Sequence, residues 1–273
     1  FSTFDTDMAP FMDGASEFEV YQAMEALIYN LNSMHSRAGA QVPFSSINLG
    51  CDTSTEGRLV TKSLLEAYEK GLGQGETPIF PNIIFRLKKD VNLNPEDPNY
   101  DLFRMAMRVS SMRMNPTFSF MDSSFNNVYD DEVAYMGCRS RVIANRHGAE
   151  VSTGRGNLSF TTINLPRIAI KANGHIDVFF KELESVMDLV ARQLHHRYQI
   201  QSHLKVKDMP FLMGQKLYLD SENLRPNDEI GSVIKHGTLS IGFIGLAEAL
   251  ISMTGKHHAQ DESSKNLGVE IVS

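Results

Sequence analysis

The sequence lacks, or has few of, the residues on which several common classes of site depend. It contains no tryptophan, two cysteines in 273 residues and no CxxC pair. Two cysteines cannot build a disulfide framework, and the missing CxxC pair excludes the commonest zinc-binding pattern. No apolar run approaches the ~18 residues of a membrane span, and we expect no signal peptide. These absences predict a protein of a reducing compartment, the cytoplasm, that does not enter a membrane.

Several widespread catalytic motifs are also missing. The chain has no GK[ST] of a Walker loop, no GxGxxG and no HExxH. The histidine pairs His195-His196 and His257-His258 have poor spacing for a metal, because adjacent helical residues point in different directions. We therefore predict no metal site. The formal net charge of −7 disfavours DNA or RNA as a partner, since such binding depends on phosphate neutralisation, but allows a local pocket for a small anion.

Strand-like and helical segments alternate along the chain. We predict strands at 41–50, 79–87, 117–121 and 157–165, and a strand or a strand-to-helix turn at 237–246. We predict helices at 16–39, 57–73, from Asp97-Pro98 to before Asn115-Pro116, and from Asp177 to about Tyr198. This alternation predicts βαβ units and a parallel sheet, as a barrel or as a doubly wound sheet. In both folds, chemistry collects at the carboxyl ends of the strands and on the loops that follow. The polar segment 200–235 is predicted to be an excursion between such units.

The first helix, 16–39, has a clear start and a broad apolar stripe. Ser16 and Glu19 have capping-box spacing. The stripe is formed by Phe18, Tyr21, Leu27, Ile28 and Leu31, widened by Met24 and Met34. So broad a stripe predicts packing, either within this domain or against a second subunit.

Cys138 lies in a polar stretch, between Gly137 and Arg139. A cysteine that only fills space usually has apolar neighbours, and a glycine permits a tight bend. The position fits a reactive thiol on a loop; an inert, half-buried cysteine is the alternative. A Cys-His hydrolase is a further possibility, but no spacing selects a partner from the nine histidines. Cys51, at the end of a predicted strand, fits a structural role better.

Two glycine-bearing segments border predicted strands. Gly154 and Gly156 bracket Arg155 just before the strand that begins at Asn157. Residues 236–250 resemble an anion cradle that opens a helix, where free amides and the helix dipole favour phosphate. Either segment also fits an ordinary turn, so neither pattern assigns a ligand by itself.

Six stretches, in order along the chain, carry a family resemblance. They are SRAGAQVPFSSINLG, GETPIFPNIIF, NPEDPNYDLF, EVAYMGCRSRV, GRGNLSFTTINLPRIAI and GTLSIGFIGLAEAL. Together they resemble the anaerobic ribonucleoside-triphosphate reductases, the class III glycyl-radical ribonucleotide reductases. The resemblance covers residues 1 to about 260.

The resemblance implies a ten-stranded α/β barrel, built from two antiparallel halves, with a finger loop at about 130–157 threading its centre. In this family the loop tip carries the cysteine that becomes a thiyl radical, and Cys138 is the matching position. A sulfur radical suits the reaction because the S–H bond formed is comparable in strength to the ribose 3′ C–H bond. The hydrogen is therefore returned at the end of turnover, inside a barrel that shields the radical.

Further site residues are implied by the same resemblance. Met136 and Ser140 match residues that flank the radical cysteine, and Asn157 matches a residue that contacts the ribose hydroxyls. For the substrate phosphates we predict Gly237, Thr238, Leu239 and Ser240, mainly on the amide argument for the glycine-bearing segment.

The resemblance also implies cofactors and partners. They are a ribonucleoside triphosphate substrate, ATP and dNTP effectors, formate as reductant, a radical-SAM activating enzyme and a second copy of the chain. The helix at 16–39 is expected to contribute to the dimer contact and to effector binding. The family's glycyl-radical loop, its four-cysteine zinc module and its ATP-cone have no counterpart in the sequence. We therefore expect residues 1–273 to be the central catalytic segment of a longer enzyme, unable to turn over alone and binding no cofactor itself.

Two other functions remain compatible with the sequence. One is another glycyl-radical enzyme of the lyase type, which shares the barrel but uses different sequences around its cysteine. The other is a non-catalytic nucleotide-binding module of the same fold.

Overall fold

The computed structural model describes residues 1–36, 38–129, 133–136, 140–142 and 145–273. The chain divides into two compact units, Phe1–Thr153 and Gly154–Ser273, and each is described by itself. Within the described residues the fold is mixed α/β. None of the described helices is both long enough and apolar enough to cross a bilayer.

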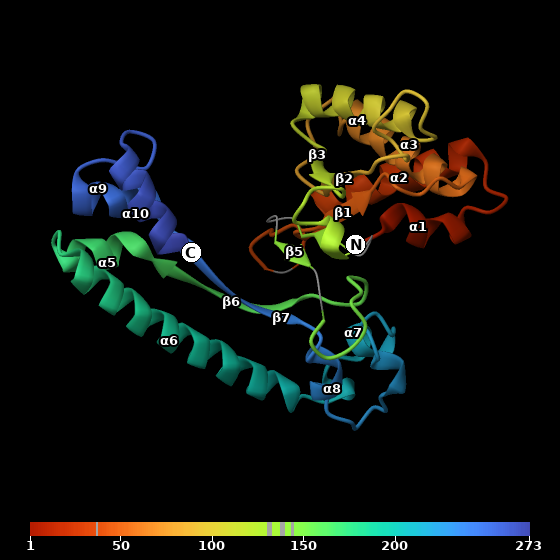
Figure 1. Ribbon diagram of the computed structural model, residues 1–273. Helices are drawn as coiled ribbons and strands as arrows, with labels where there is room; N and C mark the ends of the chain where they lie inside the picture. The colour runs from red at the N-terminus through yellow and green to blue at the C-terminus, as the bar shows by residue number, and fades with distance from the viewer. Residues whose placement is uncertain (37, 130–132, 137–139, 143–144) are drawn as a thin grey trace. The chain divides into compact units, whose positions relative to one another are not determined.

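Five strands of the first unit lie among the described residues, together with a layer of helices (Figure 1). Its helices are α1 (Phe4–Met8), η1 (Ala9–Phe11), α2 (Glu17–Ser33), α3 (Thr55–Lys70), α4 (Tyr100–Arg113) and η2 (Asn127–Tyr129). Its strands are β1 (Ser46–Leu49), β2 (Asn82–Leu87), β3 (Thr117–Phe120), β4 (Ala134–Tyr135) and β5 (Arg141–Val142).

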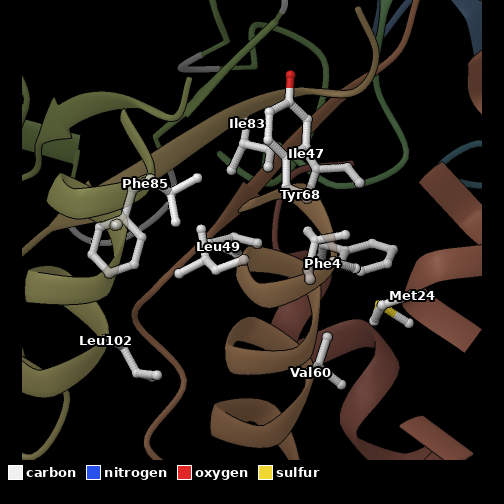
Figure 2. Close-up of a cluster of buried hydrophobic side chains, with 14 of the residues drawn as sticks. Phe4, Met24, Ile47, Leu49, Val60, Tyr68, Ile83, Phe85 and Leu102 are labelled. Atoms are coloured by element: carbon white, nitrogen blue, oxygen red, sulfur yellow. The ribbon is translucent and has the colours of Figure 1, made fainter. Parts of the chain in front are cut away.

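Strands β1, β2 and β3 form a parallel sheet in their sequence order. Helix α3 connects β1 to β2, and α4 connects β2 to β3. Alternate strand residues such as Ile47, Leu49 and Phe85 pack with residues of α2, α3 and α4 in one buried cluster (Figure 2). Sequential order with the connecting helices on one face is the pattern of a barrel segment, whereas a doubly wound sheet reverses its order and has helices on both faces.

The second unit is built around a ribbon of two parallel strands. Its helices are α5 (Leu165–Ala172), α6 (Ile176–Ser202), η3 (Val206–Asp208), α7 (Pro210–Gly214), η4 (Ser221–Asn223), α8 (Gly231–Ile234), α9 (Leu246–Thr254) and α10 (Glu262–Val272). The ribbon pairs β6 (Asn157–Asn164) with β7 (Thr238–Ile244).

One face of this ribbon contacts α6. Ser159 accepts a hydrogen bond from Arg197 (2.9 Å), and Thr161 donates one to Gln193 (3.0 Å). The residue between them, Phe160, points to the opposite face and is 68% exposed.

The described strands form sheets of three, two and two strands. The ten-stranded barrel expected from the sequence is therefore not closed within the described residues.

Helix α2 begins as predicted and ends earlier. The capping box is present, since the Glu19 amide bonds the Ser16 hydroxyl and the Glu19 carboxylate bonds the Ser16 amide. The helix ends at Ser33 rather than near Gly39. There the Asn32 side chain bonds the carbonyl groups of Ile28 and Phe80, which ties the end of the helix to the residue two before β2.

The buried face of α2 also differs from the predicted stripe. Its buried residues are Val20, Met24 and Ile28. Phe18 is 70% exposed and Met34 is 57% exposed, so these two residues of the stripe do not join the core.

Two other helix starts are displaced from their predicted positions. Pro98 precedes α4, whose N-cap is Asn99, and Asp177 lies inside the first turn of α6, whose N-cap is His175. Helix α5, which was not predicted, directly follows β6. Its N-cap is Asn164, whose side chain accepts from the Arg167 amide, and Pro166 lies in its first turn, where a missing amide costs nothing.

Tyr68→Phe tests the buried polar contacts of the first unit. The Tyr68 hydroxyl is buried, donates to the Pro78 carbonyl oxygen (2.7 Å) and accepts from Asn115 Nδ2 (2.8 Å). Because two buried groups lose a partner, the free energy of unfolding should fall by about 1–3 kcal/mol, measured by urea titration. Tyr29→Phe is the control, since Tyr29 is 40% exposed and water can replace its hydroxyl as the partner of the Gly73 amide. The change in the free energy of unfolding should stay within about 0.5 kcal/mol. Equal losses of unfolding free energy in the two variants would show that the hydrogen bonds of Tyr68 are not worth more than an exposed bond.

Gly237→Ala tests the packing at the start of β7. An added Cβ would lie 2.6 Å from Leu158 Cγ and 3.0 Å from the Gly156 carbonyl oxygen, so the start of β6 must shift. We expect a loss of about 1–3 kcal/mol in the free energy of unfolding. Gly156→Ala is the matched control, because a Cβ there meets none of the described atoms within 4 Å. If thermal denaturation places both variants at the same midpoint, the close approach is not restrictive.

Candidate functional site

The residues on either side of Cys138 form the end of a short hairpin. Strands β4 and β5 pair antiparallel, with Tyr135 opposite Arg141. The Met136 amide then donates to the Ser140 carbonyl oxygen at 2.9 Å, so the predicted flanking residues are close together, and both are half-buried. Cys138 itself lies outside the described residues.

Asn157 and Ser240 are brought together in the second unit. Asn157 is the first residue of β6, and its Nδ2 donates to the Ser240 hydroxyl oxygen at 2.9 Å. The Asn157 Oδ1 atom is buried and has no hydrogen-bond partner among the described residues. Leaving a buried acceptor unpaired costs about 1–3 kcal/mol. An added donor, such as a hydroxyl group of a ligand, fits this position.

The segment predicted to bind phosphate, Gly237–Ser240, does not present the free backbone amides that we expected. Gly237 and Thr238 donate their amides to the carbonyl groups of Ile234 and Gly156, both at 2.9 Å. Residues from Thr238 onward form β7, and the helix opens later, with Gly245 as the N-cap of α9. The amide argument for Gly237 and Thr238 is therefore wrong, because the fold itself uses these donors.

The side chains of this segment divide between the two faces of the ribbon. Thr238 pairs in register with Asn157, and Ser240 bonds it, so both face the same way as Asn157. Leu239 pairs with Ser159 and points to the face that contacts α6. Of the four residues predicted for the phosphates, only Thr238 and Ser240 have side chains on the same face of the ribbon as Asn157.

Arg155 brings a positive charge to the same end of the ribbon. Its Nε donates to the His236 carbonyl oxygen at 2.8 Å, just before Gly237. Burial lowers the pKa of the Arg155 guanidinium from its ordinary value. The sequence marked Arg155 only as a residue between two glycines, and the contact with His236 could not be read from that spacing.

A cavity of about 180 Å³ lies beside the first two residues of β6, which line it. It is lined by Asn157, Leu158, Gln201, Leu204, Met209, Met213, Tyr218, Ile230 and Ile234. Gln201 Oε1 is buried there and, like Asn157 Oδ1, is unpaired among the described residues. The lining is otherwise mostly apolar and does not include Thr238 or Ser240, so this cavity is distinct from the predicted phosphate segment. No feature of the sequence indicated Gln201.

The remaining candidates from the sequence have ordinary surroundings. The half-buried Cys51 contacts the Arg86 carbonyl oxygen through its sulfur at 3.6 Å. His195 stacks on Tyr198, with ring centroids 6.4 Å apart. Within the described part of the chain, no group of three or more His, Cys, Asp or Glu side chains is placed to hold a metal ion.

Comparison with known proteins gives consistent relatives. A family model described as "Anaerobic ribonucleoside-triphosphate reductase" matches residues 1–273. The protein of that name from Haemophilus influenzae is 31% identical over 274 residues, covering 97% of this chain and 38% of the relative. The one from Enterobacteria phage T4 is 34% identical over 254 residues, covering 89% and 41%. The chain thus spans about two fifths of the length of these curated relatives.

Solved structures share the fold. A structure described as an anaerobic ribonucleotide reductase has a TM-score of 0.58 at 16% identity, covering 98% of this chain and 42% of its own. The Thermotoga maritima anaerobic ribonucleotide reductase in complex with dATP and CTP has a TM-score of 0.57 at 16% identity, covering 94% and 42%. With the match over residues 1–273, the chain belongs to the anaerobic ribonucleoside-triphosphate reductase family.

Proposed function

We propose that this chain is the catalytic segment of an enzyme that reduces ribonucleoside triphosphates to 2′-deoxyribonucleoside triphosphates, with Cys138 as the thiyl radical. The observation that carries the proposal is the family match over residues 1–273, which includes the hairpin closed by Met136 and Ser140. That hairpin has Cys138 midway between its two closing residues in the sequence.

The proposed chemistry needs a sulfur atom. The Cys138 thiyl radical takes the 3′ hydrogen of the ribose, which forms an S–H bond and leaves a carbon radical on the sugar. The 2′ hydroxyl group then takes up a proton and leaves as water. Formate supplies two electrons and its hydrogen, which ends on the 2′ carbon, and becomes carbon dioxide. The hydrogen held by Cys138 returns to the 3′ carbon, so the thiyl radical is regenerated. Met136 and Ser140 shape the surroundings of the sulfur.

The proposed substrate contacts lie at the start of the β6–β7 ribbon. The buried, unpaired Oδ1 of Asn157 supports a hydrogen bond from a ribose hydroxyl. For the phosphates we propose the segment Gly237–Ser240, with the hydroxyl groups of Thr238 and Ser240 as donors and Leu239 contributing its backbone. Gly237 is included only because it lacks a side chain, since its amide already bonds the Ile234 carbonyl oxygen. Arg155 provides a guanidinium next to this segment, and arginine suits phosphate because it donates in a planar fork.

The proposed architecture of the whole protein is a ten-stranded α/β barrel. Two features support this architecture. The sheet β1–β2–β3 is in sequence order with its connecting helices on one face, and β6 and β7 form a parallel pair, as strands of such a barrel would. Residues 130–157 would be its finger loop. Helix α2, within the predicted range 16–39, is proposed to contribute to a homodimer contact and to effector binding; Phe18, at 70% exposure, supports a contact there.

Partners and cofactors are proposed from family membership. They are ATP and dNTP effectors, a radical-SAM activating enzyme, formate and a zinc-binding cysteine module, in the cytoplasm. The dATP and CTP bound to the Thermotoga maritima protein support a nucleotide substrate and a nucleotide effector. A glycyl radical of the enzyme supplies the unpaired electron that Cys138 uses. The family match favours this function over a lyase-type enzyme, and a non-catalytic nucleotide-binding module is the second candidate that experiment decides.

Cys138→Ser in the full-length enzyme tests the radical role. An O–H bond is much stronger than an S–H bond, so serine cannot return the hydrogen. Deoxyribonucleotide formation should fall at least about a thousandfold, while the glycyl radical still forms in the electron paramagnetic resonance spectrum. Cys51→Ser is the matched control and should keep most of the activity. If the Cys138→Ser enzyme reduced the substrate at the normal rate, the thiol of Cys138 would have no catalytic role.

Asn157→Ala tests the proposed contact with the ribose. Losing one hydrogen bond to a neutral hydroxyl group should lower kcat/KM about tenfold, measured with saturating formate. Gln193→Ala is the control, because Gln193 bonds Thr161 on the face of β6 that contacts α6. Equal kcat/KM values for the two variants would remove Asn157 from the substrate site.

A further inference from the structure

Asn48 is a buried polar residue in the middle of an apolar strand. Its neighbours on β1, Ile47 and Leu49, are fully buried among the helices of the first unit. Because side chains alternate along a strand, Asn48 points to the opposite face of the sheet, where it is 2% exposed. A polar side chain so deeply buried requires partners for its hydrogen-bonding groups.

The partner of Asn48 is the backbone of Tyr135, on β4. Asn48 Nδ2 donates to the Tyr135 carbonyl oxygen at 2.8 Å, and the Tyr135 amide donates to Asn48 Oδ1 at 3.0 Å. This reciprocal pair reproduces the exchange of bonds between facing residues of an antiparallel ladder. Asn48 Nδ2 donates its second hydrogen atom to the Phe1 carbonyl oxygen, at an N···O distance of 3.0 Å. This bond fixes the orientation of the side-chain amide.

A second buried asparagine, Asn126, also bonds the same hairpin. Asn126 is fully buried, and its Nδ2 donates to the Phe120 carbonyl oxygen at the end of β3 (2.8 Å). It lies 3.2 Å from the Tyr135 hydroxyl, and its Oδ1 accepts from Arg141 Nη1 at 3.1 Å. Both strands of the hairpin are therefore bonded to Asn126, and β4 is also bonded to Asn48.

The hairpin needs these attachments. Within the described residues, its strands β4 and β5 have two residues each, and an isolated two-stranded hairpin is marginally stable in water. Its end, at Met136 and Ser140, brackets Cys138 in the sequence. The Asn48 bonds are made at Tyr135, directly before Met136, so they set where this end lies relative to the sheet.

We propose that Asn48 is a positioning residue for the reaction, acting through the β4–β5 hairpin. The inference rests on the proposed role of Cys138. Asn48 bonds backbone groups and is assigned no contact with substrate. Its effect is geometric, because a displacement of about 1 Å of a reacting group costs about a hundredfold in rate.

The test uses Asn48→Ala in the full-length enzyme, with Asn92→Ala as a matched control. Asn92 is also fully buried and makes three comparable bonds, to the carbonyl groups of Gly50 and Arg86 and from the Lys88 amide. None of these three groups belongs to the hairpin. The two substitutions therefore remove similar buried bonds from the same unit.

We expect Asn48→Ala to lower kcat about 10- to 100-fold, with KM for the substrate and the glycyl radical content unchanged. Amide hydrogen exchange at Tyr135 should become faster in this variant and stay unchanged in Asn92→Ala. The proposal is overturned if Tyr135 exchange is unaffected, if KM rises instead of kcat falling, or if Asn92→Ala lowers kcat equally.

Asn48→Ser is the second variant if the alanine enzyme does not fold. Its hydroxyl keeps one hydrogen bond but is too short to bond both groups of Tyr135, so the same loss of kcat is expected. If neither variant folds, Asn48 is required for folding and the positioning role is rejected. Failure of the proposed function is separate: normal activity of Cys138→Ser would remove the thiyl role, whereas the exchange result at Tyr135 would stand.

Discussion

The segments that leave the sheet of the first unit depend on buried asparagine side chains to complete their backbone hydrogen bonds. Asn92 and Asn99 both donate to the Gly50 carbonyl oxygen after β1, and Asn115 bonds the Pro81 carbonyl and the Ile83 amide at the start of β2. Asn126 bonds the Phe120 carbonyl at the end of β3. Buried peptide groups without partners are costly, so irregular chain can pack against a sheet only where such partners exist. These contacts give the loops beside the sheet a defined geometry.

Local patterns were enough to predict the elements that depend on local interactions. The capping box at Ser16 and Glu19, helix α3 and strands β2 and β3 all follow from periodicity, caps and turn residues. The missed features depend on distant contacts. Helix α2 ends where Asn32 bonds Phe80, 48 residues away, and the segment 200–235 has its own small core around Ile230. Polar composition alone predicted no such core.

The candidate site divides in the same way. The family resemblance predicted that Met136 and Ser140 flank the radical cysteine, and the structure shows that the Met136 amide bonds the Ser140 carbonyl oxygen. Their role in a site stays a prediction. The physical argument for the amides at Gly237 and Thr238 failed because free amides cannot be told from bonded ones without knowing the strand partner. Asn48 gave no signal, since its partner Tyr135 is 87 residues away. One polar residue in an apolar strand is informative only when the group that it bonds is known.

The pairing of β6 with β7 has a consequence for how the chain reaches its native state. Each of these strands has only the other as a strand neighbour within the described residues, and the connection between them includes α5, α6, α7 and α8. The entropy of closing so long a connection must be offset before the ladder bonds form, so this pairing is expected to be a late event in folding. Until it forms, α6 has no sheet to cover, and the part of its apolar side that does not pack against α5 remains exposed.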